Sequence, residues 1–362
     1  MIRATGQDAP LWKGQDMEKR KKAETTLKPF VDVLEPGDPI GHLNLTLVPL
    51  RGEGHERLDY HLAADAIAAG QLTVTEISEH GSVPELLAVT RSDRMVLLLD
   101  GEELVGAKQN RILNTTVLLP AKAETKIPVS CVEQGRWRHI SHEFSSGSYS
   151  PARLRARKSR SVSHNLIMAQ EARSDQGAVW EEVASNVEVL AVCSPTMAMH
   201  DAVEQRRDWL GAYVEALPYT PQARGVVAAI NGRFVALDLL DKPSTMQRIW
   251  PRLITGYAMD AIAARQSKEK SSPKVFSAKA VSALLDHLGE IDCHPCQSVG
   301  VGQDWRFDAE DVLGQALIAE GSCVHLSAFP NQQQCFGQDS LHSIQPPSRR
   351  RRRQQGDNEI VY

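Results

Sequence analysis

Short apolar runs separated by turn signals fill the chain from about residue 40 to 132. Leu43 to Leu50 alternates between hydrophobic and polar positions with period two, which is typical of a strand with one buried face. Leu97 to Leu99 stops at Asp100-Gly101, a strong turn signal. Because no helix of crossover length separates these runs, they favour a mostly antiparallel or mixed sheet. The strands expected here are 43–50, 72–77, 86–89, 97–99, 112–119 and 125–132, with one short helix at 62–69.

Hydrophobic residues at helical spacing dominate the chain between residues 176 and 288. Ser174 or Asp175 and, further on, Ser277 stand where helix N-caps are expected, and Asn231-Gly232 is the best hairpin signal in the chain. Together the patterns predict an α+β fold: a mixed, largely antiparallel β-sheet system with four to five covering helices. The expected helices are 176–190, 201–217, 246–264 and 276–288, and the expected strands are 225–230, 234–239, 297–307 and 316–329.

The domain organisation follows from the composition. The chain has 362 residues and is 42% hydrophobic, which is enough for a sizeable core. We expect a flexible N-terminal lead over residues 1–38, a single domain over 40–330, and a disordered tail rich in Gln and Arg over 331–362. No apolar run approaches the ~20 residues of a membrane helix, so we expect no membrane contact. Six scattered cysteines suit a reducing cytoplasm.

Two polar clusters flank predicted strands and are the main candidates for chemistry. If the strands are neighbours, both clusters reach one rim of the sheet. The carboxylates of the first cluster could hold Mg²⁺ against a pyrophosphate or act as a general base, or they could belong to a solvated turn. The first cluster is Asp100, Glu102, Glu103, Lys108, Gln109, Asn110 and Arg111, and the second is Glu133, Gln134, Arg136 and Trp137.

The second cluster offers two kinds of ligand contact. Arg136 could form a forked pair of hydrogen bonds with a phosphate, and Trp137 could stack on an adenine or nicotinamide ring. The alternative is structural: a buried Glu133–Arg136 pair that ties strand ends together, with Trp137 filling core space. We favour the ligand role for the arginine and the structural role for the tryptophan.

The cysteines carry weaker signals. Cys131 lies in an apolar strand with no cationic partner close in sequence, so a small buried hydrophobe is favoured over a nucleophile. Cys293 and Cys296 have CxxC spacing and could be half of a zinc site with Cys323 and His325. The CxH spacing of that second half argues against zinc, and the absence of a preceding βαβ pattern argues against a redox pair.

Basic residues gather at Arg153 to Arg160 and at Arg349 to Arg353. The first group could bind phosphates or form an exposed basic helix face. The second group is most simply interpreted as a solvated interaction tag. Neither has interleaved aromatic residues, which argues against nucleic acid as a partner. The glycines at 300 and 302 do not open a helix, which argues against a dinucleotide fingerprint, but Asp304 and Arg306 remain candidates for a pocket wall.

Four segments resemble an uncharacterised family, the domain named for its association with ADP-ribosylglycohydrolases and with rhodanese-phosphatase superfamily proteins. The resemblance covers about residues 40 to 330, and its long middle motifs make a chance match improbable. It implies a link to NAD and ADP-ribose metabolism through the company that family members keep. The segments are Ser82 to Leu86, Gly101 to Asn114, Ile127 to Trp137 and Asp175 to Val183, with a weaker echo at Gly300 to Arg306 and Val324 to Phe329.

The expected function is binding of an ADP-ribose or NAD-derived nucleotide, with hydrolysis as the reaction class if there is one. In this interpretation Arg111 and Arg136 hold phosphate, and Gln109 and Asn110 fix orientation. Glu103 and Glu133 are the catalytic candidates, meeting ribose hydroxyls or a divalent metal. The alternative is a non-catalytic binding or scaffold protein. The other expected ligand contacts are Glu102, Lys108, Gln134, Trp137, Asp304 and Arg306.

Overall fold

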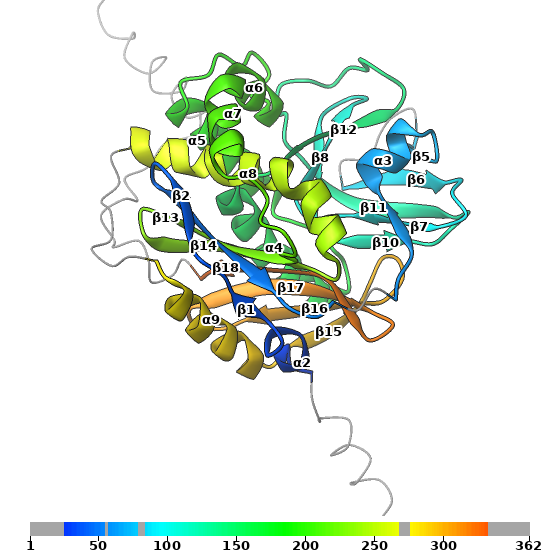
Figure 1. Ribbon diagram of the computed structural model, residues 1–362. Helices are drawn as coiled ribbons and strands as arrows, with labels where there is room; N and C mark the ends of the chain where they lie inside the picture. The colour runs from blue at the N-terminus through cyan, green and yellow to red at the C-terminus, as the bar shows by residue number, and fades with distance from the viewer. Residues whose placement is uncertain (1–24, 55–56, 79–83, 268–275, 332–362) are drawn as a thin grey trace, which may run out of the picture.

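The computed structural model describes residues 25–54, 57–78, 84–267 and 276–331. These residues form three β-sheets, almost all antiparallel, with helices packed on both faces of the largest one (Figure 1). The predicted α+β fold with a largely antiparallel sheet system is therefore confirmed.

The largest sheet has nine strands in the order β1-β3-β13-β14-β18-β17-β16-β15, with β2 paired to β3. Residues along its central strands alternate between two cores, so that Val226 faces one and Val227 the other. The strands are β1 (Glu35–Pro36), β2 (Ile40–His42), β3 (Leu45–Arg51), β13 (Gly225–Ile230), β14 (Arg233–Leu240), β15 (His294–Gln297), β16 (Gln303–Asp308), β17 (Val312–Ala319) and β18 (Ser322–Pro330).

The second sheet has six strands in the order β12-β8-β9-β11-β6-β5. An isolated antiparallel bridge between Thr75 and Glu143 joins its two ends, so the sheet closes on itself. Its inward-facing residues, among them Val74, Leu113 and Val129, form a separate apolar core. The strands are β5 (Leu72–Glu76), β6 (Glu85–Thr90), β8 (Glu102–Gly106), β9 (Arg111–Leu113), β11 (Glu124–Cys131) and β12 (Phe144–Tyr149).

A third sheet has three strands, β4 (Tyr60–Leu62), β7 (Met95–Leu98) and β10 (Val117–Leu119), which alternate along the chain with strands of the six-stranded sheet. Only its β4–β7 pair is parallel among the paired strands that the structure describes. The predicted single strand over 112–119 is instead β9 and β10, which belong to different sheets. The loop between them places Thr115 and Thr116 against the large sheet, where they bond with Asp304 and His325.

The helices cover the large sheet from both sides. The long helix α8 packs on one face, and α9 and α2 lie on the other (Figure 1). The N-cap predicted at Ser174 or Asp175 is Asp175, and the one predicted at Ser277 is confirmed, since each of these two side chains accepts a hydrogen bond from the backbone N–H three residues on. The helices are α2 (Lys28–Val31), α3 (Ala63–Ala68), α4 (Ala152–Ala169), α5 (Gln176–Val189), α6 (Met199–Gln205), α7 (Arg207–Ala216), α8 (Pro243–Gln266) and α9 (Ala278–Glu290).

Four further details differ from the sequence prediction. The expected strand 297–307 is two strands, β15 and β16, which pair antiparallel. The expected helix 201–217 is two helices, α6 and α7, that meet at Arg206. The expected strand 316–329 is the β17–β18 hairpin, which turns at Glu320-Gly321 with both residues at positive φ. Part of the expected flexible lead is packed, because the apolar side chains of Leu27, Val31 and Leu34 are buried against α9.

Other predictions fall outside the described residues. They are residues 1–24 of the lead, Ser82 and Val83 of the first family-like segment, and the tail 332–362 with its arginine run. No helix in the described ranges is long and apolar enough to cross a membrane.

Candidate functional site

The inner face of the six-stranded sheet changes from apolar to polar at one end. Side chains two residues apart on a strand face the same way, so Glu76 follows Val74 inward and Arg111 precedes Leu113 inward. By the same rule Cys131 faces inward after Val129. Three strands thus bring a carboxylate, a guanidinium and a thiol to one end of an otherwise apolar interior.

Arg111 is wholly buried and only partly hydrogen-bonded. Its Nη1 donates to Oε1 of Gln109 at 2.9 Å, and its Nη2 lies 3.8 Å from Oε1 of Glu76, beyond hydrogen-bond length. Within the described part of the chain, Nε and Nη2 of Arg111 and both carboxylate oxygens of Glu76 have no hydrogen-bond partner. Leaving such a buried charged group unsatisfied costs roughly 1–3 kcal/mol or more, so these atoms mark the strongest candidate for a ligand contact.

Trp137 forms the outer edge of this site. Its side chain is 49% exposed, so it does not fill core space as the sequence interpretation favoured. The Lys108 ammonium lies 5.3 Å from the ring centroid and the Arg111 guanidinium 5.9 Å. Cation–π contact with two basic side chains holds the indole beside the polar end of the sheet while leaving about half of it open to solvent. We call Glu76, Lys108, Arg111 and Trp137 the barrel-end site.

Glu133 and Arg136 form a buried ion pair instead of an open phosphate site. Nε of Arg136 donates to Oε1 of Glu133 at 2.7 Å, and Nη2 donates to Oε2 at 2.6 Å. The remaining donors of Arg136 bond to the carbonyls of Gly106, Ala107 and Arg138 and to the Asn110 side chain. Every nitrogen of the guanidinium is therefore engaged, and the predicted phosphate-holding role of Arg136 is replaced by a structural one.

The same pair connects the two predicted polar clusters. Glu133 also accepts from the backbone N–H of Asn110 at 3.1 Å and from the hydroxyl of Thr196 at 3.0 Å. The Gln109 side chain donates to the carbonyl of Glu133 at 2.9 Å. The expected convergence of the two clusters is thus real for Gln109 and Asn110, which both donate hydrogen bonds to Glu133, whereas Asp100, Glu102 and Glu103 of the first cluster bond elsewhere. Gln134 is exposed, next to the pair.

Glu102 and Glu103 begin β8 and are buried, so they do not lie on a solvated turn. Glu102 pairs with Arg252 on α8 at 2.9 Å. Oε2 of Glu103 accepts from the backbone N–H and hydroxyl of Ser148 and contacts Nδ1 of His200 at 3.4 Å. The hydrogen bond with Glu103 raises the pKa of His200. These contacts tie β8 to α6, α8 and β12, and they do not reach the barrel-end site.

Asp304 and Arg306 lie in the interior of the large sheet and are bonded to each other at 2.7 Å. Both also contact the hydroxyl of Thr115, at 2.5 and 2.7 Å. These contacts tie the pair to the loop between β9 and β10, and Nε and Nη1 of Arg306 have no hydrogen-bond partner among the described residues.

Cys131 shares the barrel-end interior but is not activated. Burial raises the pKa of its thiol, although the charge of Arg111 and the indole of Trp180 act in the opposite direction. The Gln176 side chain bonds to the backbone N–H and carbonyl of Cys131 at 2.8 Å each, which fixes α5 against β11. This is the structural role that the sequence favoured over nucleophilic catalysis.

Sequence reasoning missed a network of buried charges beneath α4. Arg155 donates through two nitrogens to Asp238 on β14, at 2.9 and 2.6 Å, and Lys158 pairs with Asp100 and with the carbonyl of Leu113. His325 on β18 bonds Asp238 at 3.1 Å. We call Asp100, Arg155, Lys158, Asp238 and His325 the buried ion network.

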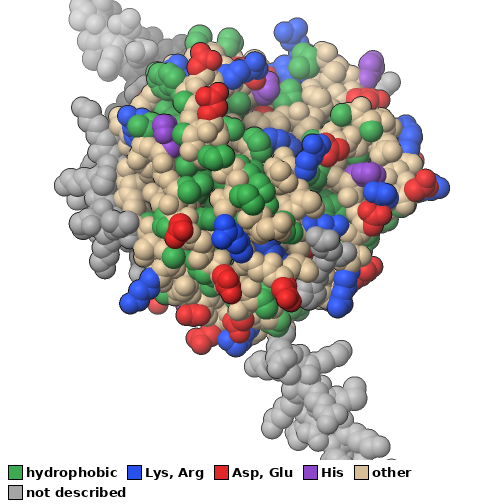
Figure 2. Space-filling view, viewed as in Figure 1, with side chains coloured by type: hydrophobic (Ala, Val, Ile, Leu, Met, Phe, Trp, Pro, Cys, Tyr) green, Lys and Arg blue, Asp and Glu red, His purple; other side chains and the backbone are tan. Residues whose placement is uncertain are grey.

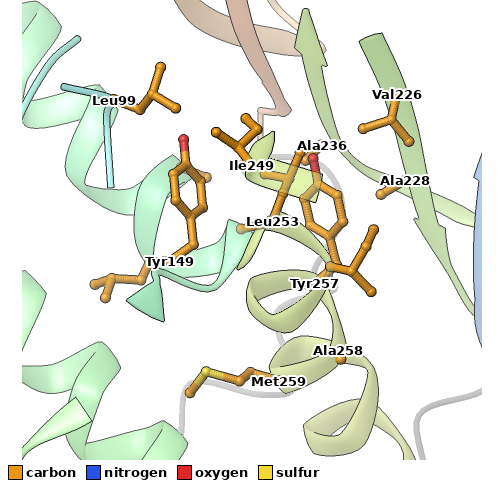
Figure 3. Packing of buried hydrophobic residues seen from close by; sticks show 14 of the residues in the cluster. Leu99, Tyr149, Val226, Ala228, Ala236, Ile249, Leu253, Tyr257, Ala258 and Met259 are labelled. Atoms are coloured by element: carbon orange, nitrogen blue, oxygen red, sulfur yellow. The ribbon is translucent and has the colours of Figure 1, made fainter. Parts of the chain in front are cut away.

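The network corrects the expectation of an exposed or phosphate-binding role for Arg155 and Lys158, whose side chains have no exposed surface, whereas the Arg157 side chain of the same group is 39% exposed. Burial lowers the pKa of Lys158 to about 8 against the attraction of Asp100. Two tyrosines border the network: Tyr257 donates to Asp238, and Arg155 lies 4.8 Å from the Tyr149 ring centroid. Figure 3 shows both rings within the apolar core, with their hydroxyls pointing the same way.

One sequence signal did mark this region. Gly101, from the predicted turn, adopts φ +79°, and a Cβ there would lie 2.7 Å from the Arg155 side chain. The turn glycine is needed both for its backbone conformation and for the close passage of Arg155. The buried state of Arg155 itself left no mark in the local sequence.

Two surface hollows lie elsewhere on the molecule. One of about 740 Å³ runs along α4 and is lined in part by Arg157, Arg160 and His164. Another of about 470 Å³ lies between α7, the end of α8 and Leu43. The first is lined by Arg157 and Arg160 of the predicted basic group, and neither is lined by a residue of the two predicted polar clusters. On the face in Figure 2, acidic and basic side chains are interspersed, and hydrophobic ones gather near its middle.

Within the described ranges, no three His, Cys, Asp or Glu side chains are grouped to hold a metal ion. The comparison with protein families gives one finding. A model described as the ARG and Rhodanese-Phosphatase-superfamily-associated Protein domain matches residues 33–329. No curated protein and no solved structure matches the chain.

Proposed function

Because the chain belongs to the ARG and Rhodanese-Phosphatase-superfamily-associated Protein domain family, we propose that it binds a nucleotide of the ADP-ribose or NAD class at the barrel-end site. The observation that carries the proposal is the half-exposed indole of Trp137 beside Lys108 and the incompletely bonded Arg111. The name of the family associates it with ADP-ribose chemistry, and the site supplies what such a ligand requires.

Each part of the site matches a part of the ligand. The exposed surface of Trp137 offers a π-face for an adenine or pyridine ring. Lys108 places a positive charge next to that ring, where it would attract the diphosphate of the nucleotide. Arg111 and Glu76 provide donors and acceptors at the inner end. An aromatic platform, phosphate charge and inner polar groups together favour a nucleotide over an apolar ligand.

Binding is favoured over hydrolysis as the primary activity. Both oxygens of Glu133 are held by Arg136, and Oε2 of Glu103 is held by Ser148 and His200, while its Oε1 is buried without a hydrogen-bond partner among the described residues. A carboxylate with both oxygens held by protein donors is a poor general base, which argues against Glu133, and Glu103 does not reach the barrel-end site. We therefore propose a nucleotide-binding protein, and we keep a turnover assay as part of its test.

The test is calorimetric titration and thermal unfolding of the purified chain with ADP-ribose and with NAD. A ligand at 100 times its dissociation constant stabilises the native state by ~2.7 kcal/mol, which raises Tm by several degrees. Trp137→Ala should weaken binding by about tenfold or more, because stacking contributes roughly 1–3 kcal/mol. Chromatography of each mixture after incubation reports any hydrolysis.

Trp209→Ala is the matched control. Trp209 on α7 is also 49% exposed and also carries a cation, with the Arg206 guanidinium 4.6 Å from its ring centroid. It should leave nucleotide affinity unchanged. Absence of binding by either nucleotide, or equal losses in the two variants, would remove the assignment of this site.

A further inference from the structure

We propose that Glu76 and Arg111 select a ligand that carries a primary carboxamide, so that the barrel-end site prefers an NAD-type dinucleotide to its carboxylate analogue and to ADP-ribose. This inference rests on the proposed nucleotide function and names its ligand. It is carried by the geometry of two charged side chains, each of which has buried polar atoms without a hydrogen-bond partner.

The two side chains come from strands that are not neighbours in the six-stranded sheet. Glu76 is at the end of β5 and Arg111 at the start of β9, with β6 and β11 between them in strand order. Their side chains are 4% and 0% exposed and approach to 3.8 Å. At this separation they attract each other but do not hydrogen-bond, so each keeps capacity for a further partner.

The chemistry of that partner follows from the donor and acceptor inventory. Arg111 offers only N–H donors, and an ionised Glu76 offers only oxygen acceptors. A single group that satisfies both must present an acceptor and a donor side by side. A primary carboxamide does so: its oxygen accepts from Arg111 while its NH₂ donates to Glu76.

Related groups fit less well. A carboxylate has acceptors alone, so it matches Arg111 but is repelled by Glu76. An ammonium group has donors alone and meets the reverse conflict. A sugar hydroxyl can donate and accept, but it brings one N–H or O–H fewer than an amide, so a ribose is the weaker competitor.

The surroundings fix the arginine in place for this role. Oε1 of Gln109 accepts from Nη1 of Arg111, and the same Gln109 donates to the backbone carbonyl of Glu133. The carboxylate of Glu133 is in turn held by Arg136. The guanidinium is thus oriented through one nitrogen while Nε and Nη2 stay available. Nε and Nη2 of Arg111 are closed to solvent, and in this proposal the ligand reaches them by displacing the half-exposed Trp137 side chain, whose ring centroid lies 5.9 Å from the guanidinium.

The decisive experiment compares two dinucleotides that differ in one group. NAD carries a carboxamide on its pyridine ring, and nicotinic acid adenine dinucleotide carries a carboxylate there. We expect the wild-type chain to bind NAD at least tenfold more tightly than the acid form in calorimetric titrations, with ADP-ribose also weaker than NAD. Nicotinamide and nicotinic acid, titrated as fragments, should show the same order.

Glu76→Gln tests the mechanism of the preference. A glutamine can donate to a carboxylate, so this variant should lose the preference for NAD or reverse it. Glu124→Gln, at an exposed position at the start of β11, is the matched control and should keep the wild-type order. Circular dichroism verifies that both variants fold; the wild-type comparison needs no variant and stands if Glu76→Gln does not fold.

The outcomes separate this inference from the function on which it rests. Equal affinities for NAD, its acid form and ADP-ribose in the wild-type chain would overturn the carboxamide assignment and leave nucleotide binding intact. Binding of none of the dinucleotides and of neither fragment would overturn both. An NAD preference that survives Glu76→Gln would show that other residues make the selection.

Discussion

Arg136 holds Glu133 through two parallel hydrogen bonds, Nε to Oε1 at 2.7 Å and Nη2 to Oε2 at 2.6 Å. The two side chains are 7% and 6% exposed. Because Asn110 contacts both partners, the pair fastens the segment after β8 to the segment after β11. This ion pair is what makes the two polar clusters of the sequence meet in space.

Arg136→Ala should therefore reduce stability strongly instead of merely removing ligand affinity. Removing one partner of a buried pair leaves an uncompensated charge and typically costs about 3–5 kcal/mol. Urea unfolding of the variant measures this loss. Arg138→Ala, at an exposed neighbouring position, should change the free energy of unfolding by less than ~0.5 kcal/mol. A fully stable Arg136→Ala that no longer binds nucleotide would restore the phosphate-holding role.

Local signals in the sequence were sufficient for local structure. Asn231-Gly232 predicted the β13–β14 hairpin, and both residues have the positive φ that its turn requires. Asp175 and Ser277 predicted two helix starts through their capping side chains. The convergence of the two polar clusters was predicted on the condition that their strands are neighbours, which holds for Gln109 to Arg111 at the start of β9 and Glu133 to Trp137 after β11, but not for Glu102 and Glu103 on β8.

Contacts between residues far apart in the sequence could not be predicted from local signals of this kind. Arg155 is buried against Asp238, which lies 83 positions away in the sequence. The residues next to Arg155 in the sequence do not distinguish this buried arginine from one exposed to water. The partner of Arg111 was missed for the same reason, since Glu76 reaches it only because the sheet closes through Thr75 and Glu143. Closure of a sheet depends on twist and packing that a pattern of period two does not encode.

Asp238→Asn should destabilise the chain through the buried ion network. Arg155 donates to both oxygens of Asp238, and Tyr257 and His325 also bond to it. Burial alone would raise the pKa of Asp238, but Arg155 and His325 lower it on balance, so the residue is ionised and its charge is needed. We expect a loss of about 3–5 kcal/mol in urea unfolding.

Asp311→Asn is the control for this loss. Asp311 pairs with His287 at 2.9 Å, but its side chain is 65% exposed. Exposed pairs contribute roughly 0–1 kcal/mol, so its loss should be small. Similar small effects at both positions would mean that Asp238 contributes little and that the network is replaceable.

The cysteines should differ in reactivity according to burial. Cys193 is exposed, whereas Cys131 and Cys323 are buried and burial raises the pKa of both thiols, to about 12 for Cys323. Since the thiolate is the reactive form, iodoacetamide at pH 7.5 should label Cys193 within minutes and leave the other two unmodified. Peptide mass spectrometry gives the labelled fraction at each site. Rapid labelling of Cys131 in the folded chain would reopen its candidacy as a nucleophile.

Asp260 should give the chain a measurable pH dependence. Its Oδ2 accepts from the backbone N–H of Arg153 at 3.1 Å, at the start of α4. Burial raises the pKa of this carboxyl from 3.8 to about 7, against the opposing charge of Arg153. The native state therefore keeps a proton that the unfolded chain has already lost. Its contribution to stability is greatest at low pH and is lost as the pH rises from about 4 to 7.

Asp260→Asn isolates this contribution, because asparagine keeps an acceptor for Arg153 but never ionises. The free energy of unfolding of the variant minus that of wild type should rise by on the order of 2–3 kcal/mol between pH 5 and pH 8, at 1.36 kcal/mol per pKa unit. Urea unfolding of both proteins at the two pH values measures it. Asp208→Asn, exposed on α7, should show no such rise. An equal difference at both pH values for Asp260→Asn would mean that Asp260 is already ionised in the native state at pH 5, with its charge balanced by Arg153.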